Sequence, residues 1–152
     1  MIGVFGTLDE LIESLKAAGC NEVTFGRITE VDMDKEGQYP LAHITPVSTN
    51  LLERTAEIAY SVTVLDIVLD GAKTNLFTND NELGKSNLAD VLHNTAKISN
   101  KVWQQYLRDG NKYYFSGTAK ELTPVLFEYK NILAGYSFEF TYLVPNNEEG
   151  SC

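Results

Sequence analysis

Apolar and polar side chains alternate most regularly near the C-terminal end of the chain, within residues 131–145. The apolar positions are Tyr136, Phe138, Phe140, Tyr142 and Val144. Because successive side chains of a strand point to opposite faces, this spacing predicts a closing strand with one apolar and one polar face. Gly135 comes directly before the pattern and Pro145 directly after it, and both residue types are typical of element boundaries. We therefore expect the aromatic face of this strand to build the core.

Two segments have helical spacing instead. The first begins at Thr7, which has capping-box spacing to Glu10, and Gly19 is a suitable C-terminal stop. Its apolar stripe is Leu8, Leu11, Ile12 and Leu15. The second, longer helix is predicted to begin between residues 79 and 87 and to run to about Arg108. Its positions at helical spacing are Leu88, Val91, Leu92, Thr95, Ile98, Val102, Trp103 and Tyr106.

The remaining patterned segments are predicted strands. They cover residues 22–28, 39–46, 56–69 and 112–117, and a less regular stretch follows at 122–129. The short glycine-containing connection between the first two strands predicts a hairpin. Alternation in the third strand ends at Val64, so a bulge or a strong twist is expected beyond it.

The elements follow one another as a helix, three strands, a helix and two strands. This order predicts an α+β fold, with a mainly antiparallel five-stranded sheet packed against two helices. At 152 residues the chain has the length of one ordinary domain. We assign residues 1–145 to a single α+β domain and residues 146–152 to a polar C-terminal tail.

The chain is acidic, with a formal net charge of −9 and a pI of about 4.6. Proteins that grip nucleic acid need a basic surface, so this composition argues against such binding. The charge fits either simple solubility or a surface along which DNA passes without being held. The sequence lacks a run of the about 20 apolar residues that a membrane span requires, so no membrane partner is expected. Cys20 and Cys152 form neither a metal motif nor a disulfide framework, which favours free thiols in a reducing cytoplasm.

An acidic turn offers the best match to a metal-binding motif, and the match is incomplete. Asp32, Asp34, Glu36 and Gly37 agree with the first, third, fifth and sixth positions of an EF-hand calcium loop. The twelfth position, where a bidentate glutamate belongs, is His43. A solvated turn between two strands is the favoured interpretation, with weak adventitious calcium binding as the alternative.

The histidines do not indicate chemistry. His43 lies within a predicted strand and His93 on the long helix, and neither has a cysteine or carboxylate at a ligand spacing. The sequence contains no glycine-rich phosphate loop, nucleophile elbow or zinc motif. We therefore predict no catalytic residue, no metal ligand and no cofactor, and we do not expect an enzyme.

Candidate contact residues lie in the turns and in the less regular segment. Leu76 and Phe77 are apolar residues in an otherwise polar loop, where they either fold over the sheet edge or project into a neighbouring subunit. The full set of candidate oligomer or partner contacts is Asp32, Asp34, Glu36, Tyr39, Leu76, Phe77, Val125, Leu126 and Phe127.

Three segments together resemble one protein family. They are residues 32–44 (DMDKEGQYPLAHI), the strand 56–69 followed by residues 79–82 (NDNE), and residues 123–136 (TPVLFEYKNILAGY) continuing to Pro145. In this order the segments are similar to the small tail-terminator, or tail-completion, proteins of tailed bacteriophages. The resemblance covers most of the chain from about residue 25, and its motifs are structural rather than catalytic.

The resemblance implies a structural virion protein that forms a homo-oligomeric ring, typically six-fold, on the head-proximal end of the tail tube. Such a ring stops tube polymerisation and joins the tail to the head. Its expected partners are therefore the tail tube protein and the head–tail connector, or neck, protein. Genomic DNA would pass through the ring without specific binding. The implied location is the virion, after assembly in the host cytoplasm, and the family uses no cofactor.

The chain also departs from the family pattern. Its long helix is more polar between the apolar positions, and Tyr136 stands where an indole is more typical. Another neck component, such as a head-completion or connector protein, is therefore an alternative. A different class is a small ligand-binding or enzymatic α+β domain, which would have a pocket with converging polar groups.

Overall fold

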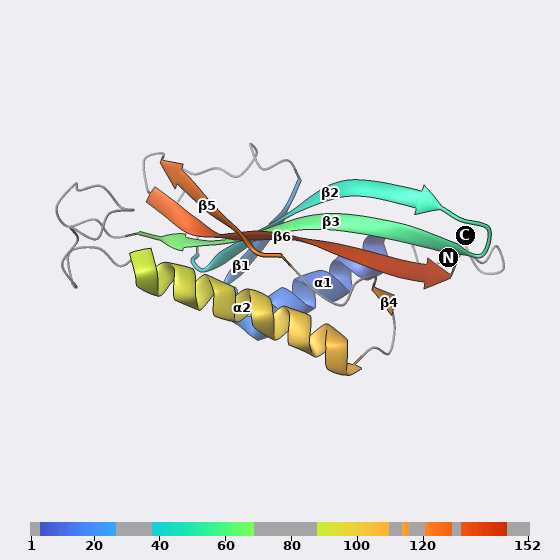
Figure 1. Ribbon diagram of the computed structural model, residues 1–152, viewed down its shortest axis with the longest axis horizontal. Helices are drawn as coiled ribbons and strands as arrows, with labels where there is room; N and C mark the ends of the chain where they lie inside the picture. Colours follow the sequence, from blue (N-terminus) through green and yellow to red (C-terminus); the bar gives the residue numbers. More distant parts are fainter. Residues whose placement is uncertain are drawn as a thin grey trace.

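Two helices lie on one side of a mainly antiparallel sheet in the computed structural model (Figure 1). The structure describes residues 4–26, 38–68, 88–109, 114–115, 121–128 and 132–145. The helices are α1 (Val4–Ala18) and α2 (Leu88–Asp109). The strands are β1 (Glu22–Phe25), β2 (Leu41–Leu51), β3 (Thr55–Ile67), β4 (Tyr114–Phe115), β5 (Thr123–Glu128) and β6 (Ile132–Pro145).

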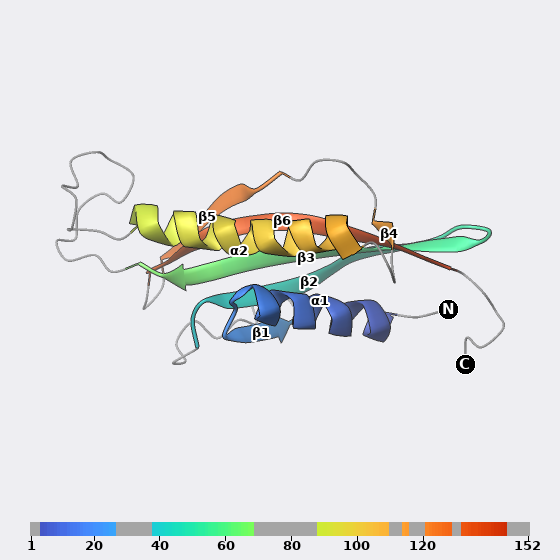
Figure 2. The same ribbon diagram turned by 90° about the horizontal axis from the view of Figure 1, so that it is seen from below.

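The sheet has the order β1-β2-β3-β6-β4, and β5 pairs with β6 outside this order. Because β3 occupies one edge of β6, the two strands β4 and β5 share the other edge. Both helices cover the same face of the sheet (Figure 2). The predicted α+β class, with a mainly antiparallel sheet and two helices, is confirmed. The segment expected to be less regular, residues 122–129, contains the regular strand β5.

The first two strands are parallel. Glu22 lies opposite Leu41 and Phe25 opposite Ile44, in parallel register. The predicted hairpin between these strands is therefore wrong. Parallel neighbours need a connection of about a dozen residues or more, and residues 26–40 meet that requirement.

Helix α1 begins one turn earlier than the capping pattern predicts. Its first residue is Val4, so Thr7 lies inside the helix and cannot act as its N-cap. The Thr7 side chain is buried, and its hydroxyl lies 2.8 Å from the hydroxyl of Tyr60 on β3. The capping-box prediction is wrong because this threonine makes a tertiary hydrogen bond between α1 and the sheet.

The end of α1 agrees with prediction. Gly19 has a φ of 124°, a conformation that favours glycine. Its N–H donates to the Lys16 carbonyl at 3.2 Å, and the Cys20 N–H donates to the Leu15 carbonyl at 3.0 Å. This pair of bonds is the Schellman arrangement, which satisfies carbonyls that the helix end leaves open.

The main core lies between the helices and the sheet. The buried positions of α2 are Leu88, Val91, Thr95, Ile98, Ser99, Val102 and Tyr106. The Phe140 ring on β6 packs 6.0 Å from Trp103 and 5.1 Å from Tyr106, measured between ring centroids. The hydroxyls of Tyr106 and Tyr142 are 2.6 Å apart within this core. The predicted helical stripe is confirmed, and so is the apolar face of the closing strand from Phe138 to Val144, whereas Tyr136 is only half-buried and lies outside this core.

The closing strand is longer than its alternating pattern. β6 begins at Ile132, so Gly135 lies inside the strand rather than at its boundary. At this point β3 and β6 approach closely, because a Cβ added to Gly135 would lie 1.7 Å from the Val64 carbonyl oxygen. The predicted strand start at Gly135 is therefore wrong, and the glycine marks a close backbone approach.

The sheet buries apolar residues on its second face as well. Val64 packs on the helix side, so the next residue, Leu65, points to the opposite face, where it is also buried. We call the group there the far-face cluster. Its members are Leu41, Leu65 and Leu133, with the half-buried Tyr39, Ile67, Val125 and Phe127 packed against them.

This cluster explains why alternation ends at Val64. Beyond that point the apolar residues of β3, Leu65 and Ile67, lie on the far face and Asp66 falls on the helix side, so the earlier pattern ends without a change of backbone register. The register of β3 with both neighbours is continuous there, and the expected bulge is absent from the described part of β3. The register shift lies in β2 instead, between Pro46 and Ser48.

Candidate interaction surfaces

The structure describes four of the nine predicted contact residues. Those outside the described residues are Asp32, Asp34, Glu36, Leu76 and Phe77. The four that are described are Tyr39, Val125, Leu126 and Phe127. Their positions divide them between the two faces of the sheet.

Three of these residues meet on the face opposite the helices. Tyr39, Val125 and Phe127 are half-buried and pack on the far-face cluster, although they come from segments far apart in the sequence. Burial raises the pKa of the Tyr39 hydroxyl, and the nearby carboxylates of Glu22 and Asp66 raise it further. The hydroxyl therefore remains protonated at neutral pH and can act as a donor.

Leu126 lies on the other side of β5. It packs with residues of α2 and β6, including Leu88, Leu92 and Ala134. An apolar cavity of about 190 Å³ opens there, which we call the end cleft. Its lining residues are Leu88, Leu92, Pro124, Val125, Leu126 and Ala134. The end cleft lies where α2 begins and β5 passes beside it.

Three exposed apolar side chains lie along the outer part of β2 and in its turn into β3. We call residues 47–54 the hairpin tip. Val47 is 48% exposed, Leu51 70% and Leu52 47%. In the part of the chain that the structure describes, the other exposed large apolar side chains are Phe25 and Leu107. Exposed apolar groups concentrated on one projection are typical of a docking element.

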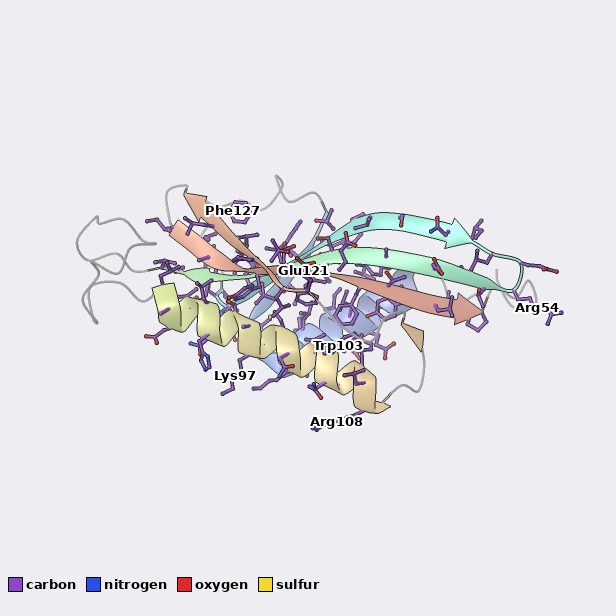
Figure 3. All side chains as sticks on the ribbon, viewed as in Figure 1. Arg54, Lys97, Trp103, Arg108, Glu121 and Phe127 are labelled. Atoms are coloured by element: carbon purple, nitrogen blue, oxygen red, sulfur yellow. The ribbon has the colours of Figure 1, made fainter. Side chains whose placement is uncertain are left out.

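The hairpin tip projects beyond both helices, and Arg54 stands at its outer end (Figure 3). The Leu52 N–H donates to the Thr55 carbonyl at 2.8 Å and closes the turn. Sequence reasoning missed this feature. The sequence shows only that Leu51 and Leu52 are adjacent leucines directly before two charged residues between two strand patterns, which does not reveal their exposure.

The free edge of β2 is protected against pairing with another strand. The Ile44 carbonyl accepts a hydrogen bond from the Gly26 N–H, so this carbonyl points to the edge of β2 on the β1 side. Pro46 lies two residues further along β2, so its nitrogen faces the same edge. This nitrogen carries no hydrogen and cannot donate to a neighbouring strand. The register shift between Pro46 and Ser48 follows at once. Proline and bulges are common means of blocking strand addition, so pairing with another strand is obstructed at this part of β2.

A polar recess of about 490 Å³ lies beside β5 and β6. It is lined by Ser61, Glu121, Thr123, Val125, Ser137, Phe138 and Glu139. Hydroxyls and carboxylates dominate the lining, and the Thr63 hydroxyl donates to the Ser137 hydroxyl at 3.4 Å on the same sheet face. Within the described ranges, no group of three or more His, Cys, Asp and Glu side chains is arranged to hold a metal ion.

His43 joins the two parallel strands. Its side chain is 2% exposed, with Nδ1 at 2.6 Å from the Thr24 hydroxyl and Nε2 at 3.1 Å from the Gly26 carbonyl. A carbonyl only accepts, so Nε2 must carry a proton. In the neutral ring Nδ1 then accepts from the threonine hydroxyl. The histidine is a buried structural residue that holds β1 against β2.

Replacing His43 by alanine is expected to lower the free energy of unfolding by about 2–4 kcal/mol, since it removes two buried hydrogen bonds and leaves a cavity. Urea unfolding followed by circular dichroism measures the change. The matched control is His93→Ala on the exposed face of α2, which should change stability by no more than about 0.5 kcal/mol. Equal effects for the two variants would show that the buried bonds contribute little.

Neither described helix combines the length and the apolar composition that crossing a bilayer demands. Comparison of the chain with protein-family models gives no match. A search of curated proteins likewise gives no match.

Proposed function

We propose that the protein is a tail-terminator subunit of a tailed bacteriophage. In this role it assembles into a ring on the head-proximal end of the tail tube, stops tube polymerisation and joins the tail to the head connector. The resemblance of three sequence segments to this family motivates the proposal. In the structure these segments contribute to adjacent strands, since β2, β3, β6 and β5 are neighbours.

One observation carries the proposal beyond the resemblance. Three of the five exposed large apolar side chains among the described residues lie on the hairpin tip, namely Val47, Leu51 and Leu52. A lone subunit gains nothing from apolar groups held in water on a projection, whereas a subunit in an assembly buries them against a neighbour. A ring requires a heterologous contact, in which different surfaces of each copy meet.

The charge of the chain is compatible with a ring that DNA crosses. With a formal net charge of −9, the protein offers little attraction to phosphate groups. Genomic DNA therefore would not be retained by the wall of the opening. Charge supports this part of the proposal without distinguishing it from solubility.

Tail-tube polymerisation provides the test. Tube subunits of the same virus are assembled with and without the protein, and tube lengths are measured in electron micrographs. We expect arrested tubes with an additional ring at one end. An acidic protein of similar mass serves as the control and should leave the length distribution unchanged. Tubes that grow equally long in the presence of the protein, without a terminal ring, would reject the proposal.

Ligand binding is the second candidate function, because the polar recess brings hydroxyls and two carboxylates, Glu121 and Glu139, to one place. The same assay separates the two functions. A ligand-binding domain would leave tube length unchanged, whereas a terminator would change it. A connector or head-completion protein would form a ring without arresting the tube.

A further inference from the structure

We draw no further inference here: the strongest candidate, the apolar end cleft between the start of α2 and β5, carries none because nothing in the structure shows what covers it.

Discussion

Replacing Gly135 by alanine is expected to destabilise the fold by about 3 kcal/mol or more. The added Cβ would lie 1.7 Å from the carbonyl oxygen of Val64 and 2.8 Å from its carbonyl carbon. Both atoms belong to the backbone of β3, which is paired with β6 on one side and β2 on the other. Relief of the clash therefore requires the two central strands to separate. Urea unfolding should show a lower midpoint, or the variant should fail to accumulate as folded protein.

Gly19→Ala is the matched control for this substitution. An added Cβ there would meet only side-chain atoms of Ile98, the nearest at 3.7 Å, so it causes no clash. Its cost is limited to the φ of 124°, about 1–2 kcal/mol for a residue other than glycine. The prediction fails if Gly135→Ala proves no more destabilising than Gly19→Ala.

Alkaline pH is expected to unfold the protein in steps that begin near the ordinary pKa of a thiol. Burial raises the pKa of Cys20 from 9.0 to about 12. The folded state therefore keeps this proton where the unfolded state has released it. Stability is fully present below about pH 9 and falls by about 1.4 kcal/mol for each pH unit above it, up to about 4 kcal/mol at pH 12.

Buried tyrosines extend the same effect to higher pH. Burial raises the pKa of Tyr142, and the neighbouring Tyr106 adds to the shift. Burial also raises the pKa of Tyr60, against a smaller lowering by its hydrogen bond with Thr7. An unfolded chain releases these protons from about pH 10, so stability is lost as the pH rises beyond that value.

Unfolding free energies measured from about pH 7 to pH 11 test this prediction. Cys20→Ala serves as the control, because it removes the thiol and leaves the tyrosines. Its stability should stay level between about pH 9 and pH 10, where that of the unmodified chain declines. Parallel curves for the two proteins would show that the buried thiol does not set the alkaline limit.

Patterns of side chains predicted the elements well where one face of an element is buried. The alternation from Phe138 to Val144 and the helical stripe from Ile98 to Tyr106 both correspond to residues facing the main core. These patterns fail where both faces are buried. The apolar residues around Leu65 lie on two different clusters, and a period of two cannot appear when inside and outside are equally apolar.

Pairing partners were harder to predict than elements. The connection between β1 and β2 contains a turn-like acidic segment, which favoured a hairpin, yet the strands are parallel. Glycine is typical of element boundaries, yet Gly135 lies inside a strand. It is needed there because the backbone of the partner strand β3 comes close, which the local sequence does not show. The role of Thr7 was missed for the same reason, because its hydrogen-bond partner, the Tyr60 hydroxyl, lies far along the chain.

The candidate surfaces were only partly predictable. Tyr39, Val125 and Phe127 were selected separately, and the structure brings them to one cluster. Because these side chains are half-buried in that cluster, less of their surface is available to contact a partner. The leucines of the hairpin tip were overlooked because the strand predicted at residues 39–46 ends before them, whereas β2 continues to Leu51. Exposure depends on whether a helix covers that position, and the local sequence does not contain that information.

The far-face cluster has a mechanical consequence for the rest of the sheet. At the Leu65 end of β3, side chains are buried on both faces, whereas the Thr55 end alternates between buried and half-buried positions. The sheet is therefore held by packing on both faces at the Leu65 end and on fewer positions at the Thr55 end. Fewer side chains are buried near the turn at Leu51, so a small change in its angle is expected to disturb less packing than a change at the base. In the proposed ring, this would let neighbouring copies meet at slightly different angles.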